Sequence, residues 1–262
     1  MIHESLFDAS RKGNLSVVKG LFEEDGVSPD SSDDNGFTPL MLTAYLGHVS
    51  LVSLLLSYIN IEPNKTNSFG TTAFVSACSG GSVSVVKMFL LDPRVDPTIA
   101  NNYGSTALMM AAWKTHSLVV KLLLDDGRVD PNLTSSIEGN TALISAARNS
   151  FRSETKTVSL LLADKRLEPN IPNNDGKTAL ACAATSELFI PVLEILLSNK
   201  RVTRTRPHEG EENYDIALSN VRRTRSARLR GIIRAIVVFR RMRLRAAVLV
   251  YARGGEGFSA AS

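Results

Sequence analysis

Apolar and polar residues alternate in short blocks along the first 200 residues, and the apolar positions follow the spacing of α-helices. Two kinds of apolar block alternate along the sequence. One kind, rich in Leu and Val, recurs as LVSLLL, VVKMFL, VVKLLL, VSLLLA and VLEILL. Apolar residues three and four positions apart share one face of a helix. The pattern therefore predicts an all-α fold built from pairs of short helices.

The other kind of block begins each time with the same local signal. A Gly stands two residues before a Thr, and these glycines are spaced 34, 34, 35 and 37 residues apart: Gly36, Gly70, Gly104, Gly139 and Gly176. A Gly permits the positive φ of a tight turn, and a Thr hydroxyl caps the helix that follows. Two small residues come at a fixed distance after each Thr, as Thr43-Ala44 does in the first instance. The chain is therefore a repeat of helix, turn, helix and loop, with small residues where neighbouring helices pack closely.

This unit resembles the ankyrin repeat, nearly position by position over FTPLMLTAYLGHVSLVSLLL, residues 37–56. An N-terminal unit is recognisable in LFDASRKGNLSVVKGLF at residues 6–22. It lacks the Thr-Pro-Leu sequence that begins the first helix of the repeat at residues 37–56, as a capping repeat would. The resemblance implies an all-α, ankyrin-repeat solenoid of about six helix-turn-helix repeats with short turn or hairpin loops, followed by a basic C-terminal tail.

The repeat register predicts a division of the chain into an array and a tail. We expect the array over residues 1–218 and the tail over 219–262. The expected units of the array are a capping unit at 1–33, repeats at about 34–67, 68–101, 102–136, 137–173 and 174–209, and a degraded unit from 210.

Charge is distributed unevenly between the two parts. Residues 1–200 carry a net charge of −5, whereas residues 201–262 carry +9 with 14 Arg and no Lys. The tail at 219–262 contains 11 Arg and one acidic residue. Three interpretations of the tail stay open. It could be a helix that caps the array, or a basic segment, disordered or amphipathic, that binds nucleic acid or an anionic membrane. It could also be the product of an altered reading frame at the end of the gene.

Composition narrows the class of protein. With 44% hydrophobic and 21% charged residues, the chain is globular rather than collagen-like or wholly disordered. Cys78 and Cys182 form no CxxC motif, so we expect small buried residues rather than a disulfide scaffold or a zinc module. The N-terminus lacks a secretory signal pattern, and no stretch of about 18 uncharged apolar residues occurs. We therefore expect a monomeric, intracellular, cytoplasmic protein.

Motifs for catalysis do not occur in the sequence. HExxH, G-x-S-x-G and P-loop patterns are missing, and we expect no catalytic residue, metal or cofactor. His48 and His116 share one register position, which indicates a structural role in the repeat. Asp125 and Asp126 end a second helix, and we interpret them as solvated loop charges rather than as general acids or bases.

The resemblance also implies where a partner would bind. Ankyrin-like proteins bind proteins through the turn tips and the exposed side of the first helices, which stack into a concave surface. The candidate partner-binding residues at the tips are Phe37, Phe69, Tyr103, Glu138 and Lys177, and those at the ends of first helices are Tyr45, Trp113, Lys114 and Arg148.

The aromatic candidates could form one strip across three units, or some could merely cover the helix layer. Trp and Tyr are the residues most enriched in binding hot spots. We therefore expect a non-catalytic scaffold that binds an unidentified protein partner. The alternative is binding of nucleic acid or an anionic membrane surface through the Arg-rich tail.

Overall fold

The computed structural model describes residues 2–24, 26–149, 155–183 and 190–202. Within these ranges the chain forms twelve helices and no strand: α1 (Ile2–Lys12), α2 (Leu15–Glu23), α3 (Pro39–Leu46), α4 (Val49–Ser57), α5 (Ala73–Gly80), α6 (Val83–Leu91), α7 (Ala107–Trp113), α8 (Ser117–Asp126), α9 (Ala142–Arg148), α10 (Thr155–Ala163), α11 (Ala179–Ala183) and α12 (Ile190–Ser198). The predicted degraded unit from 210 and the Arg-rich tail lie outside the described residues.

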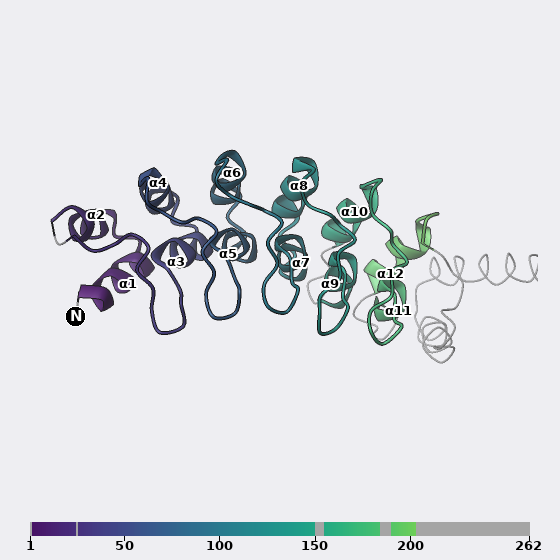
Figure 1. Ribbon diagram of the computed structural model, residues 1–262. Helices are drawn as coiled ribbons and strands as arrows, with labels where there is room; N and C mark the ends of the chain where they lie inside the picture. Colours follow the sequence, from purple (N-terminus) through teal and green to yellow (C-terminus); the bar gives the residue numbers. More distant parts are fainter. Residues whose placement is uncertain (1, 25, 150–154, 184–189, 203–262) are drawn as a thin grey trace, which may run out of the picture.

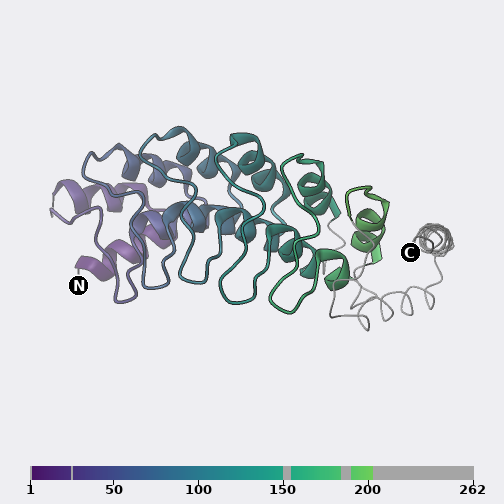
Figure 2. The ribbon, with the colours of Figure 1, turned by 45° about the vertical axis from the view of Figure 1, so that its right-hand side comes forward.

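The helices stack in two rows, so that the fold is a solenoid of helix pairs (Figures 1 and 2). Helices α1, α3, α5, α7, α9 and α11 form an inner row, and the helix that follows each of them lies in the outer row. The loops that carry the turn glycines project to one side, next to the inner row (Figure 1). No helix among the described residues is both long and apolar enough to cross a membrane.

The inner helices begin as the sequence predicts. The Thr Oγ1 accepts a hydrogen bond from the backbone N–H three residues later in five helices, at Thr38, Thr72, Thr106, Thr141 and Thr178. The turn glycines have φ angles between 68° and 78°. Each cap satisfies a backbone donor that would otherwise lack a partner in the first turn of the helix.

The small residues of the repeat lie between neighbouring inner helices and let them approach closely. Ala44, Ala77, Cys78 and Ala111 are each 0% exposed. One such close approach occurs between α3 and α5, where a Cβ on Gly80 would lie 2.8 Å from the carbonyl carbon of Tyr45. The core of the array is thus a continuous apolar layer between the two rows and between successive pairs.

Hydrogen bonds between backbone atoms also join the turn tips. The N–H of Ser68 donates to the carbonyl of Asn35 over 3.0 Å. The same bond recurs between the next three pairs of tips, from Asn102 to Phe69, from Ser136 to Tyr103 and from Asn174 to Glu138. Each tip is therefore positioned by the one before it, which fixes where its side chains point.

Candidate partner-binding surface

The inner helices expose two successive positions at their C-terminal ends. These positions are Tyr45 and Leu46 in α3, Ser79 and Gly80 in α5, Trp113 and the following Lys114 in α7, and Arg148 and the following Asn149 in α9. Tyr45 is 50% exposed and Trp113 is 39% exposed. We call these eight residues the inner face.

The aromatic candidates on the turn tips are also partly exposed. Phe69 is 42% and Tyr103 45% exposed, while Phe37 is half-buried against the core. The rings of Phe37 and Phe69 are in contact, with centroids 6.3 Å apart. The structure thus brings two of the five aromatic candidates together, and the continuous strip across three units stays a prediction.

Two of the charged candidates form an ion pair with each other. Arg148 at the end of α9 pairs with Glu138 on the adjacent tip, and Glu138 also accepts a hydrogen bond from Asn140. Lys177 lies 3.6 Å from the carboxylate of Asp175. Lys114 is exposed and forms no ion pair with any described residue.

Two exposed apolar residues belong to this surface although the sequence did not single them out. Ile137 on the fourth tip is 65% exposed, and Leu46 beside Tyr45 is 47% exposed. By its hydrogen bonds Ile137 matches Ser68 of the second tip: the side-chain amide of Asn174 donates to the carbonyl of Ile137, as that of Asn102 does to Ser68. Glu138 takes the tip position of Phe69 and Tyr103.

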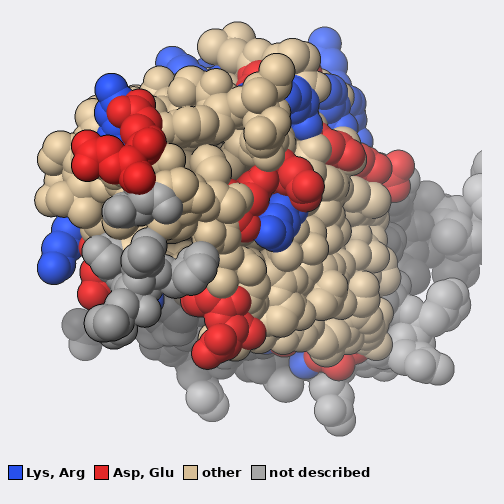
Figure 3. Space-filling view, turned by 60° about the vertical axis from the view of Figure 1, so that its left-hand side comes forward, with Lys and Arg blue, Asp and Glu red and all other residues tan. Residues whose placement is uncertain are grey.

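Seen from the N-terminal side, acidic and basic side chains lie close together in mixed clusters beside a broad area without charge (Figure 3). Helices α3, α5, α7, α9 and α11 contain a single charged residue among them, Arg148. The inner face itself combines the aromatic or apolar Tyr45, Leu46 and Trp113 with two charged residues, Lys114 and Arg148.

A comparison with protein families identifies the fold. The family model described as "Ankyrin repeats (3 copies)" matches residues 6–98, 58–135 and 108–206. The chain belongs to the ankyrin repeat family. Ankyrin repeats generally serve as protein–protein interaction modules and are typically not enzymes.

Solved structures contain the same ankyrin repeat architecture. The crystal structure of EF0377, an ankyrin repeat protein, superposes with a TM-score of 0.62 at 27% identity, and the match covers 74% of this chain and 96% of that one. The comparison with curated proteins gives no match.

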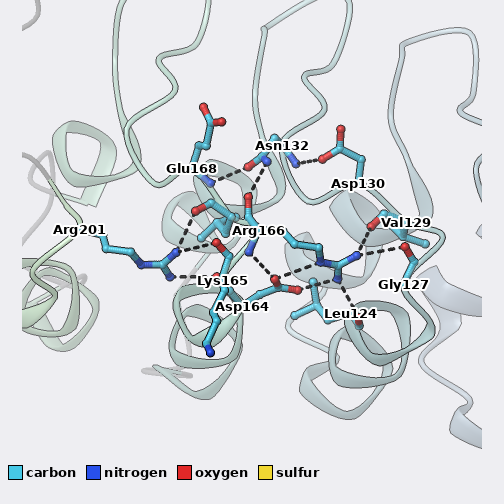
Figure 4. A network of polar contacts seen from close by, with 11 residues as sticks. Leu124, Gly127, Val129, Asp130, Asn132, Asp164, Lys165, Arg166, Glu168 and Arg201 are labelled. Carbon is cyan, nitrogen blue, oxygen red and sulfur yellow. Dashed lines mark hydrogen bonds and ion pairs between the residues drawn. The ribbon is translucent and has the colours of Figure 1, made fainter.

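The outer side of the ankyrin array carries a ladder of arginines that the sequence analysis missed. They share one repeat position, and each reaches back to the C-terminal end of the preceding outer helix: Arg94, Arg128, Arg166 and Arg201. Arg166, for example, donates to the carbonyls of Leu124 over 2.8 Å and Gly127 over 3.1 Å (Figure 4). These bonds satisfy carbonyls that lack partners in the last turn of a helix.

Each of three ladder arginines is held by an aspartate two residues before it. Hydrogen bonds from the Arg side chains lower the pKa of each of these carboxyl groups, in Asp92, Asp126 and Asp164, below the ordinary value for aspartate. The side chain of Asp126 is only 15% exposed and pairs with Arg128. Our interpretation of Asp126 as a solvated charge was therefore wrong, because the residue fixes an inter-repeat contact.

Asparagines add a second row of bonds between loops of the same ankyrin units. Asn132 donates to the carbonyl of Arg166 over 2.8 Å and accepts from the N–H of Glu168 over 2.7 Å (Figure 4). Asn64 makes the equivalent pair of bonds with Arg94 and Asp96. Polar loop residues thus hold successive repeats in register.

The histidines and cysteines have the structural roles that the sequence predicts. Nε2 of His48 donates to the carbonyl of Arg11 over 2.9 Å, and Nε2 of His116 donates to that of Ser79 over 3.0 Å. Cys78 and Cys182 are buried and form no disulfide, and burial raises the pKa of both thiols. Nowhere in the described ranges do three or more potential metal ligands cluster.

Proposed function

We propose that this ankyrin repeat chain is a non-catalytic scaffold that binds a protein partner through its turn tips and inner face. One observation carries the proposal: the exposed aromatic side chains lie on the turn tips (Phe69, Tyr103) and at the ends of inner helices α3 and α7 (Tyr45, Trp113), which contain no charged residue. Aromatic residues are enriched in protein interfaces, and charged residues are depleted from their centres. The fixed tips favour binding because a preorganised surface loses little conformational entropy on association.

Trp113 provides the sharpest test. Nothing in the stacking of the repeats requires an indole there, since the equivalent positions hold Tyr45, Ser79 and Arg148. Truncating a hot-spot Trp costs at least about 2 kcal/mol of binding, roughly thirtyfold in affinity. We expect Trp113→Ala to weaken the main partner at least about tenfold while the thermal midpoint changes little.

The experiment compares proteins captured by the full wild-type chain and by two variants, with mass spectrometry as the readout. Leu91→Ala is the matched control, because Leu91 is 84% exposed at the end of outer helix α6. A partner retained by Leu91→Ala and lost by Trp113→Ala supports the proposal. Intact binding with a large loss of stability in Trp113→Ala would instead place the indole in the core and contradict it.

The alternative function depends on residues 219–262, which lie outside the described part of the chain. Its support is the excess of 11 Arg over one acidic residue. If the tail binds nucleic acid or an anionic membrane, deleting it abolishes binding, and the affinity of the intact chain falls steeply with salt. Under our proposal, the partner of the array survives that deletion.

A further inference from the structure

Lys114 is the cation of the inner face that forms no ion pair with any residue the structure describes. The other basic candidates are neutralised locally, Arg148 by Glu138 and Lys177 by Asp175. Lys114 follows Trp113 directly, and the equivalent positions in α3 and α5 hold the uncharged Leu46 and Gly80. An exposed lysine thus directly follows an exposed indole on a face whose other cation, Arg148, is paired with Glu138.

The next residue departs from what the fold favours as well. Thr115 has φ +58°, and it is the one non-glycine residue with positive φ among the described residues. The same turn in the two preceding repeats is made by Gly47 and Gly81, with φ angles of 78° and 81°. Backbone strain of this kind costs energy and collects at binding sites. Thr115 therefore adopts the positive φ of the repeat turn without the glycine that makes it elsewhere.

Small side chains separate the two large aromatic residues of the inner face. Helix α5 packs between α3 and α7, and it contributes Ser79 at the position where its neighbours carry Tyr45 and Trp113. Gly80, beside Ser79, has no side chain. A bulky side chain of a partner that lies over α5 would therefore lie between the two aromatic residues.

We infer, on the basis of the proposed function, that the partner segment carries an acidic residue next to a bulky apolar or aromatic one. The apolar side chain lies over Ser79 between Tyr45 and Trp113, and the carboxylate pairs with Lys114. Opposite charge selects the acidic residue, while the aromatic contact supplies most of the affinity. A basic residue at the same place would be repelled by Lys114.

The test uses random linear peptides displayed on phage and selected on the immobilised full-length chain. Fluorescence anisotropy then measures the affinity of the selected peptides for variants. We expect peptides with Asp or Glu beside Trp, Tyr, Phe or Leu. Lys114→Glu should weaken them about fivefold at low salt and less at high salt, because an exposed ion pair is screened.

Two comparisons separate charge complementarity from a general loss of fold. Peptides in which Lys replaces the acidic residue should bind Lys114→Glu better than they bind the wild type. Lys87→Glu is the matched control, since Lys87 is an exposed lysine of outer helix α6. It should leave peptide affinity unchanged.

Ser79→Tyr tests the position of the apolar side chain. The fold accepts a large aromatic residue at this register position in α3 and in α7, so the thermal midpoint should stay within a few degrees. Peptide affinity should fall about tenfold, because the new ring occupies the space over α5.

The outcomes distinguish this inference from the function on which it rests. Peptides that depend on Trp113 but show no acidic preference, or bind Lys114→Glu and Lys87→Glu equally well, overturn the inference alone. Unchanged binding to Ser79→Tyr overturns it too. A selection that yields no peptide sensitive to Trp113→Ala or Tyr45→Ala overturns the proposed function as well.

Discussion

Replacing Gly80 by Ala should destabilise the array, although the same change usually stabilises a helix. Gly80 is the last residue of α5 and has an ordinary helical φ, so an alanine there needs no unusual backbone conformation. The obstacle is the neighbouring helix. A Cβ on Gly80 would overlap the carbonyl oxygen of Tyr45 and lie 2.8 Å from its carbonyl carbon and 3.0 Å from its Cα.

The size of the effect follows from these distances. Carbon atoms in favourable contact are about 3.5–4.0 Å apart, so α3 and α5 must separate by roughly 1 Å. Overpacking of this degree costs about 1–3 kcal/mol. The higher helix propensity of Ala stabilises a helix by up to about 1 kcal/mol relative to Gly, and by less at a helix end. We expect the free energy of unfolding to fall by about 1–2 kcal/mol.

Urea denaturation followed by circular dichroism measures this change, and Gly20→Ala is its matched control. Gly20 lies inside α2, and no heavy atom lies within 4 Å of where its Cβ would be. Gly20→Ala should therefore raise the stability by about 0.5–1 kcal/mol. If Gly80→Ala raised the urea midpoint as Gly20→Ala does, the close packing of α3 on α5 would be refuted.

Three further predictions concern stability. Thr115→Gly should raise the free energy of unfolding by about 0.5–1 kcal/mol in denaturant titrations, since glycine accepts positive φ without steric cost; no gain would mean that the turn is unstrained. Ala111→Glu should cost several kcal/mol, because Ala111 is 0% exposed; a loss below about 1 kcal/mol would show that our register for the small residues is wrong. The side chain of Arg166 lowers the pKa of Asp164 in the folded state below the ordinary value of 3.8. The ion pair therefore contributes its full stability above pH 3.8 and loses it as the pH falls through the lower pKa of the folded state. The stability gap between wild type and Asp164→Asn should therefore be full near neutral pH and shrink below about pH 4, and a constant gap down to about pH 3 would contradict the role of Arg166.

Much of the fold could be predicted because its signals are local. The hydroxyl of Thr38 bonds to Met41, three residues away, and the turn before it needs only the φ of Gly36. Such signals repeat at nearly constant spacing, so each instance supports the others. The exposure of Tyr45 and Trp113 followed from the same register.

The missed features depend on contacts between repeats. Arg94 bonds to Leu56, which lies 38 residues earlier in the chain, and no local pattern shows that acceptor. The recurrent arginine could have been found from the sequence motif R-V-D-P or R-L-E-P, which begins at Arg94, Arg128 and Arg166. Whether the aromatic tips act together cannot follow from register alone, since it depends on the shape of the partner.

The arginine ladder gives the array a direction. Every arginine bonds backwards, to the outer helix of the preceding unit, and Arg94, Arg128 and Arg166 each pair with an aspartate of their own unit. Removing a unit from the N-terminal end therefore leaves an arginine that is still neutralised. Removing one from the C-terminal end exposes bare carbonyls on the helix that becomes last. Unfolding should thus start more easily at α1 and progress one unit at a time towards α12.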